Sequence, residues 1–284
     1  MLTANRFIQI TGTAAALVGI IAIAESRRDY RFTVGPKANI SVVNDYGQIS
    51  VRPSTGTQVL VTATVHSDKV EVDNDQSGNR IQIHSHLLPG ANSETGTVDY
   101  ELQVPPDASI TLHSSNGPLH AEKLNGDVTL EGATANVDVK DVSDAHVHVN
   151  TVSGEVKLVN IRNGHVEVTS VSGPITLTDV SGPKVQVNST SGKISYAGDF
   201  GGSGEYVLVS HTGDIEATVP EGASFDVTAR SVRGHVDSED LQFQPKNHTF
   251  FSQVPGSAFA GTMGKAASSV VLRTFSGKIH LKKR

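Results

Sequence analysis

The stretch that decides the fold runs from Thr151 to Ser195 and reads TVSGEVKLVNIRNGHVEVTSVSGPITLTDVSGPKVQVNSTSGKIS. Short runs in it alternate apolar with polar residues, and each run is preceded by Ser-Gly or Asn-Gly. Alternation of this kind predicts a strand with one buried face. The glycine supplies the positive φ that a tight turn requires. The stretch is therefore a series of short strands joined by turns.

The same unit recurs on both sides of this stretch. The first apolar residue of each run falls at Leu119, Val128, Val137, Val147, Val156, Val166, Ile175, Val185 and Ile194. Successive positions differ by 9 or 10 residues, so two runs make a unit of about 19 residues. A short fixed period predicts coils that stack in order to bury their apolar rows. We therefore expect an all-β protein, a single-stranded parallel β-solenoid with about 19 residues per coil.

An antiparallel meander with Ser-Gly hairpin turns is the alternative arrangement. The spacing of charged residues favours the parallel stack. Asp138 precedes Lys157 by 19 residues, and His148 precedes Glu167 by the same interval. In a parallel stack each basic side chain would lie about 4.8 Å from its acidic neighbour on the adjacent coil.

The chain divides into three regions. We expect a signal peptide or membrane anchor at 1–24, β-rich coils with insertions at 25–112, and regular repeats at 113–284 with a loop or cap inserted at 239–265. In the second region the alternation predicts strands at 30–34, 39–43, 48–51, 59–65, 80–84 and 98–104, and an exposed loop at 87–96. The final repeat, Val270 to Leu281, is expected to close the solenoid.

The first region is nearly free of charge after Arg6 and predicts a hydrophobic helix at the N-terminus. Its small-residue end at Ala22 to Ala24 is typical of a cleaved secretory signal. About 18 apolar residues also just span a bilayer, so an uncleaved anchor is the alternative. A buried helix is a third interpretation. The first two both imply an exported protein.

Composition excludes several classes of protein. The 284 residues contain no Cys, which rules out disulfides, thiolate metal sites and a Cys nucleophile. The formal net charge of -6 argues against nucleic acid as a partner, because nucleic-acid binders need a basic field. No phosphate-binding loop, dinucleotide fingerprint or nucleophile elbow occurs, and we expect no cofactor.

Three features in order carry a resemblance to a known family. They are the segment YELQVPPDAS at 100–109, the serial Ser/Asn-Gly-x-Val/Ile copies from Gly117 to Gly192, and a second entry ATVPEGAS at 217–224 followed by SGKI at 276–279. Together they resemble the putative-adhesin β-strand-repeat family of bacterial proteins, over about residues 30–284. The resemblance implies a parallel β-solenoid on an exported or membrane-tethered protein, and it implies no established activity.

Two clusters could carry chemistry. Asp127, His146, His165 and Lys184 share one column at intervals of 19 residues, which suggests either a divalent-metal site or an exposed polar ladder. Asp138, Asp141 and Asp144 suggest either acid-base chemistry on a polysaccharide or solvated turns. We favour the polar ladder and the solvated turns, and expect no catalytic, cofactor-binding or metal-binding residue.

The sequence therefore indicates a non-enzymatic, exported rod at the bacterial cell envelope, an adhesin or surface interaction protein. Its expected partner is a protein, a cell surface or a second copy, with membrane contact only through residues 1–24. The expected interaction surface comprises Thr129, Asp138, His148, Lys157, Glu167, Thr176, Phe250 and Phe251. The alternatives are a membrane-anchored periplasmic scaffold or regulatory domain and a polysaccharide-active β-helix enzyme.

Overall fold

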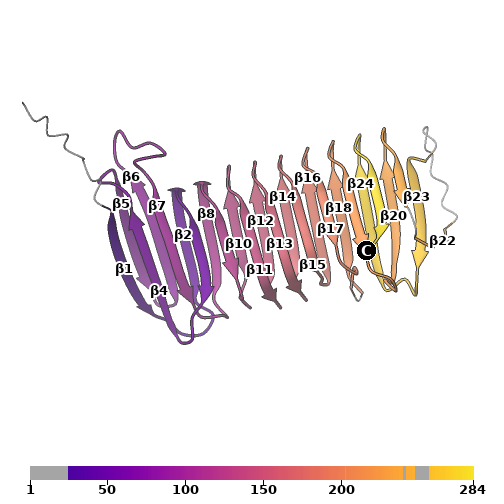
Figure 1. The fold of residues 1–284 in the computed structure, drawn as a ribbon. Coiled ribbons are helices and arrows are strands. Elements are labelled where there is room, and N and C mark those ends of the chain that lie inside the picture. Colours follow the sequence, from indigo (N-terminus) through magenta and orange to yellow (C-terminus); the bar gives the residue numbers. More distant parts are fainter. Residues whose placement is uncertain (1–24, 202, 239–240, 247–255) are drawn as a thin grey trace, which may run out of the picture.

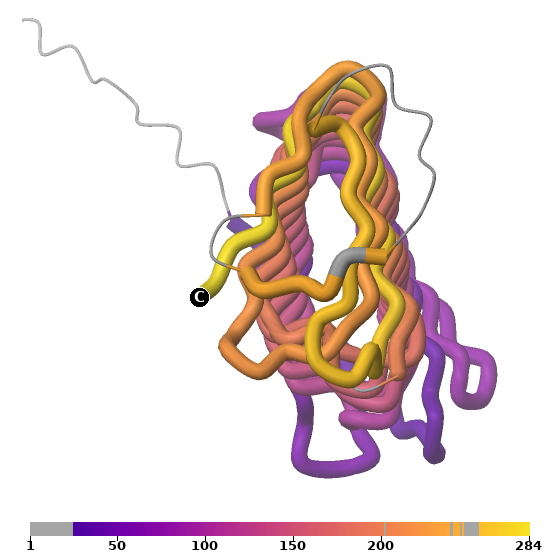
Figure 2. Tube along the Cα trace, turned by 90° about the vertical axis from the view of Figure 1, so that its right-hand side faces the viewer, coloured from indigo at the N-terminus to yellow at the C-terminus, as the bar shows by residue number. Residues whose placement is uncertain are grey.

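The computed structural model describes residues 25–201, 203–238, 241–246 and 256–284. Its elements are strands in two long sheets, which form the opposite walls of an elongated rod (Figures 1 and 2). No helix in these ranges is long and apolar enough to cross a membrane. The predicted hydrophobic helix and its use as signal or anchor lie outside the described residues.

Sheet A forms one wall. Its strands, in spatial order, are β1 (Ser26–Thr33), β4 (Gln58–Val65), β7 (Val98–Val104), β3 (Ile49–Pro53), β9 (Leu119–Glu122), β11 (Val137–Ser143), β13 (Val156–Arg162), β15 (Ile175–Val180), β17 (Ile194–Ala197), β19 (Ile215–Val219), β25 (Ile279–Lys283) and β21 (Val236–Ser238).

Sheet B forms the other wall. Its strands, listed from the C-terminal end of the rod, are β22 (Gln244–Pro245), β23 (Ala258–Met263), β20 (Phe225–Ser231), β24 (Ser268–Thr274), β18 (Glu205–Ser210), β16 (Lys184–Ser189), β14 (His165–Ser170), β12 (His146–Thr151), β10 (Val128–Gly132), β8 (Ser109–Asn116), β2 (Asn39–Tyr46), β6 (Arg80–Leu87) and β5 (Val70–Ser77).

The pairing in the repeat region is parallel, which confirms the stacked arrangement and shows that the antiparallel meander is wrong. Asp138 on β11 is in register with Lys157 on β13, and His148 on β12 is in register with Glu167 on β14. The inward residues of both walls are mostly Val, Leu and Ile, with some Ala, Phe and Tyr, and they form one continuous core. Stacking thus buries apolar rows that a single coil could not bury alone.

The tight turn from sheet B to sheet A explains the glycines. Ser189 and Thr274 each begin such a turn, and their buried hydroxyls accept the N–H of the residue three positions later, Gly192 at 2.8 Å and Gly277 at 3.1 Å. A Cβ added at Gly192 would lie 2.0 Å from the carbonyl oxygen of Gly173 on the neighbouring coil. Close approach of the coils therefore excludes a side chain there. At Gly173 the φ of 99° adds a second reason.

The N-terminal part contains antiparallel pairs. Strand β4 is antiparallel to both β1 and β7, and β5 is antiparallel to β6. The strands expected in this region are present with slightly different ends, and β5 is additional. Its sequence VEVDNDQS loses the apolar alternation after Val72, and its later residues are exposed, so period-2 hydrophobicity gave no signal there.

The C-terminal part differs from expectation in its order. The last repeat, containing β24 and β25, does not close the solenoid. Strand β24 lies between β18 and β20, and β25 lies between β19 and β21. Strand β23, within the expected insertion, instead pairs antiparallel with β20 at the sheet edge. The final repeat matches its neighbours in pattern, so the coils β18–β19 and β20–β21 both accept it.

Candidate interaction surfaces

The six predicted surface residues of the regular repeats lie on two opposite walls. Asp138, Lys157 and Thr176 form a row across β11, β13 and β15 on the outer face of sheet A. The other three form an equivalent row across β10, β12 and β14 of sheet B; they are Thr129, His148 and Glu167. The structure therefore brings these residues together as two rows of three.

The remaining predicted pair, Phe250 and Phe251, lies outside the described residues. Two other phenylalanines of the same segment are described, and they pack inward. Phe243 lies 6.0 Å from Phe225 and 5.0 Å from Phe259, measured between ring centroids. Both Phe243 and Phe259 pack against the hydrophobic core, so this part of the segment covers the C-terminal coils.

Sheet B carries the histidine column. The rings of His146 and His165 stack with centroids 4.9 Å apart, and the backbone N–H of His146 donates to the Asp127 carboxylate at 3.0 Å. His148 Nδ1 lies 3.6 Å from Glu167 Oε2. Within the described ranges no three His, Asp or Glu side chains are grouped so that they could hold a metal ion. In this column the Asp127 carboxylate accepts a backbone hydrogen bond, and the two imidazole rings stack on each other.

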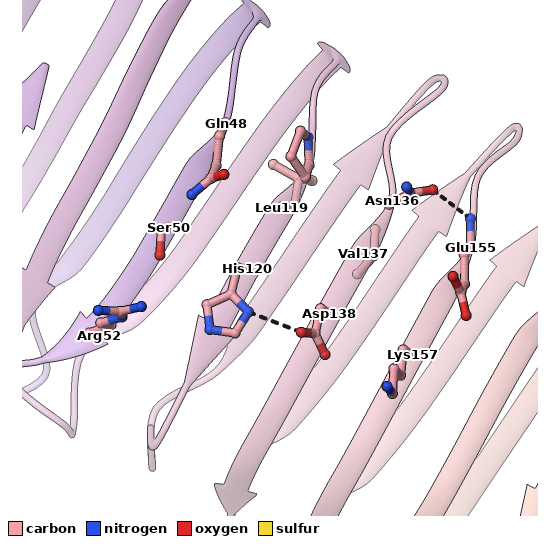
Figure 3. Close-up of a pocket in the computed structure, with 11 residues that line it drawn as sticks. Gln48, Ser50, Arg52, Leu119, His120, Asn136, Val137, Asp138, Glu155 and Lys157 are labelled. Atoms are coloured by element: carbon pink, nitrogen blue, oxygen red, sulfur yellow. Dashed lines mark hydrogen bonds and ion pairs between the residues drawn. The ribbon is translucent and has the colours of Figure 1, made fainter. Parts of the chain in front are cut away.

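Sheet A carries a groove of about 390 Å³ (Figure 3). It crosses β3, β9, β11 and β13, and its centre is the pair of His120 Nδ1 and Asp138 Oδ2, 3.3 Å apart. Lys140 Nζ donates to the same Asp138 oxygen at 2.6 Å, and this bond raises the pKa of Lys140. The small Ser50 lies in register with His120, which leaves room for the hollow.

A second ion pair borders the groove. Glu122 Oε1 lies 3.4 Å from Arg52 Nε, and its other oxygen lies 3.6 Å from His120 Nε2. Positive and negative groups therefore alternate along this face. Sequence reasoning missed His120, although its 18-residue distance from Asp138 matches the step between β9 and β11. Arg52 and Glu122 come from strands 70 residues apart, and no repeat signal links them.

The three aspartates of the acidic cluster lie at different places in the fold. Asp138 and Asp141 both lie on β11, where Asp141 has a positive φ of 54°, and Asp144 follows the end of that strand with a φ of 55°. Asp and Asn tolerate this left-handed conformation better than other residues with side chains. Asn160 on the next coil donates to Asp141, and Asn163 donates to Asp144 at 2.5 Å. The three carboxylates are thus held by separate partners and do not converge on a common point.

The turn from sheet B to sheet A carries a row of exposed apolar side chains. Val152, Val171 and Val232 are 55%, 48% and 45% exposed, and they are the exposed large hydrophobic residues of the described chain. All three occupy the second position of the turn. The same position on the intervening coils holds Thr190, His211 and Phe275. We call these six residues the valine ridge.

The ridge is ordered by its backbone. On successive coils the residue after each ridge position donates its N–H to the preceding ridge residue, as Ser172 does to the carbonyl of Val152 at 2.9 Å. The rings of His211 and Phe275 stack with centroids 5.0 Å apart, and the Arg233 guanidinium lies 4.9 Å from the Phe275 centroid. Sequence analysis missed the ridge because the apolar-polar alternation led us to place these valines in the core. The repeated Ser/Thr-x-x-Gly motif could have shown that they lie at the second position of a turn.

Fold and surfaces together define a two-walled parallel β-solenoid protein that presents the valine ridge, with its three exposed valines, and charged flat faces. The chain belongs to the Toastrack DUF4097 family, which matches residues 38–282. No curated protein matches the sequence.

Solved structures were also compared with the chain. One is a putative cell adhesion protein from Clostridium sporogenes, with 11% identity, a TM-score of 0.30 and coverage of 91% of this chain and 100% of that chain. A putative adhesin from Bacteroides fragilis has 10% identity, a TM-score of 0.41 and coverage of 91% and 98%. A putative adhesin from Parabacteroides merdae has 10% identity, a TM-score of 0.31 and coverage of 91% and 96%.

Proposed function

We propose that this protein is a non-enzymatic interaction rod, exported to the bacterial cell envelope, that binds a protein partner in the manner of an adhesin. The valine ridge is the observation that carries the proposal. Exposed apolar residues that lie side by side mark interaction sites, and Val152 and Val171 lie on adjacent coils of the ridge. Three of the six ridge positions are valines at least 45% exposed.

The geometry of the ridge suits an elongated contact. Neighbouring coils are about 4.8 Å apart, so six positions present side chains over about 24 Å. Every position is held by backbone hydrogen bonds between coils, and little ordering entropy is lost when a partner binds. The flat faces beside the ridge carry charged rows, including Lys157 and Glu167, which would set the orientation of the partner.

Adhesion tests this function. Beads coated with the purified full chain should adhere to intact cells or to surfaces coated with extracellular-matrix protein, whereas beads coated with serum albumin should not. If the coated beads bind neither cells nor matrix, the adhesin function is wrong.

Protease shaving of intact cells tests the location. A C-terminal tag that is removed, on a chain whose mature N-terminus is Glu25, supports a surface protein. A protected tag on a chain that keeps residues 1–24 would contradict surface adhesion and favour the anchored periplasmic scaffold.

A further inference from the structure

The two ends of the rod differ in the strands that they expose. At the C-terminal end the edge strands of the described chain are β21 and β22, with 3 and 2 residues, and β22 contains Pro245. At the N-terminal end the edge strands are β1 and β5, with 8 residues each. Proteins protect sheet edges with short strands and proline, because unpaired backbone groups bind other strands. The long N-terminal edges have neither device. They carry charged side chains instead, which favour pairing only with a strand of complementary charge.

The two N-terminal edge strands run in the same direction. Strand β1 is antiparallel to β4, which is antiparallel to β7, so β1 follows the direction of sheet A. Strand β5 is antiparallel to β6, which is parallel to β2, so β5 opposes the direction of sheet B. A tight turn carries the chain from one wall to the other, so the repeat strands of the two walls run in opposite directions. Consequently β1 and β5 point the same way.

The N-terminal end also has a step. Sheet A has three strands beyond β3, namely β7, β4 and β1, whereas sheet B has two strands beyond β2, namely β6 and β5. The Tyr100 hydroxyl on β7 is 2.7 Å from the Ser85 hydroxyl on β6, which shows that these two strands face each other. Strand β1 therefore projects one strand further than β5, by about 4.8 Å (Figure 1).

The two edges carry opposite net charges. The outward residues of β1 are Arg27, Asp29, Arg31 and Thr33, all exposed, so this row has a net positive charge even though Arg27 lies 3.2 Å from Asp29. The outward residues of β5 are Glu71, Asp73 and Asp75, all exposed. Like charges on adjacent strands repel and opposite charges attract. Pairing of β5 with another β5 is therefore disfavoured, whereas pairing of β5 with β1, whose outward row has a net positive charge, is favoured.

We propose that two copies of this chain join head to head, with β1 of each copy pairing in parallel with β5 of the other. A two-fold axis along the strands aligns sheet A of one copy with sheet B of the second, and the two steps then fit each other. Both strand pairs form at once, so the contact closes as a dimer and leaves no edge for a filament. The same axis leaves both valine ridges along one edge of a doubled rod, which would add avidity to binding.

A charge exchange tests the dimer. One variant carries Glu71→Lys, Asp73→Lys and Asp75→Lys, and the other carries Arg27→Glu and Arg31→Glu. The full chain is measured by sedimentation velocity in mild detergent, because residues 7–24 are apolar. Wild type should sediment as a dimer and each variant alone as a monomer, whereas an equal mixture of the two variants should form a heterodimer. The heterodimer restores opposite charges in both strand pairs.

Two results would overturn the proposal. The first is a wild-type protein that remains monomeric at every concentration that sedimentation velocity can measure. The second is a charge variant that still dimerises on its own. Circular dichroism and melting temperature check that each variant is folded. A second measurement maps the contact, using the absence of Cys in the chain. Arg31→Cys and Asp73→Cys variants should be joined by a short bismaleimide only when mixed, and cross-linking of either variant to itself would contradict the pairing.

Discussion

Gly132 stands where the neighbouring turns have a serine or threonine, and Ala135 stands where they have a glycine. Gly132 is in register with Ser114 on one side and Thr151 on the other. Ala135 occupies the glycine position of its turn and is fully buried. A Cβ added at Gly132 would lie 2.8 Å from the Cβ of Ala135, so the missing side chain at one position makes room for the methyl at the other.

This exchange predicts strong coupling between the two positions. Gly132→Ser alone should destabilise the protein by about 1–3 kcal/mol, because the added Cβ meets the Ala135 methyl. Ala135→Gly alone should cost about 1 kcal/mol or more through lost burial and added backbone freedom. The double variant restores the common Ser-x-x-Gly turn and should be more stable than the sum predicts. Urea unfolding of all four proteins measures this, and strictly additive free energies would contradict it.

The same substitution should change the free energy of unfolding by very different amounts at two valines of one coil. Val171→Thr on the ridge should change the free energy of unfolding by less than about 0.5 kcal/mol, because Val171 is 48% exposed and threonine already occupies this position at Thr190. Val166→Thr should cost about 1–3 kcal/mol, because Val166 is 2% exposed and the hydroxyl would be buried. Equal destabilisation at both positions would show that the ridge is part of the core.

The left-handed position at Asn160, within β13, should distinguish glycine from alanine. Asn160 has a φ of 57° and donates to Asp141. Asn160→Ala should destabilise the fold by about 1–2 kcal/mol through left-handed strain, in addition to the lost hydrogen bond. Asn160→Gly loses the same hydrogen bond, but glycine adopts the left-handed conformation without strain. It should therefore be the more stable of the two variants. Thermal unfolding that ranks alanine above glycine would contradict this account.

Acid should weaken one surface ion pair in a defined pH range. Hydrogen bonds from Lys193, at 2.7 Å, and from Lys282 lower the pKa of Glu216 to about 2 from the usual 4.5. A lowered pKa in the folded state adds stability above pH 4.5 that is lost as the pH falls toward 2. Glu216→Gln should therefore be less stable than wild type near neutral pH, and the difference should shrink from pH 4.5 downwards and vanish only below pH 2. Unfolding free energies that differ by a constant amount from pH 2 to 5 would contradict it.

The repeat period made the walls predictable. Val128 to Ile194 recur at intervals of 9 or 10, and the 19-residue separation of Asp138 and Lys157 correctly places them side by side. The division of the predicted surface residues between two walls could also have been predicted, because Thr129 and Asp138 differ by 9 residues, which is half a coil. The sequence analysis did not use this spacing to assign each residue to a wall.

Other features depend on tertiary contacts that the sequence does not specify. The position of β24 between β18 and β20 was not predictable, because any coil with the same apolar pattern could accept it. The ion pair beside the groove joins Arg52 to Glu122, and strands β4 to β8 lie between these residues in the sequence, so no period relates them. Val152 and Val171 were missed for a different reason: a valine next to a turn is normally assigned to the interior.

The most direct test of the central claim is bead adhesion by a ridge variant carrying Val152→Thr, Val171→Thr and Val232→Thr. Its control is Val159→Thr, which changes a half-buried outward valine on sheet A and leaves the ridge intact. Both proteins should remain folded, with circular dichroism spectra like that of wild type. We predict that the ridge variant loses at least tenfold in bound beads, whereas the control binds like wild type. Full adhesion by a folded ridge variant would contradict the claim that the valine ridge binds the partner.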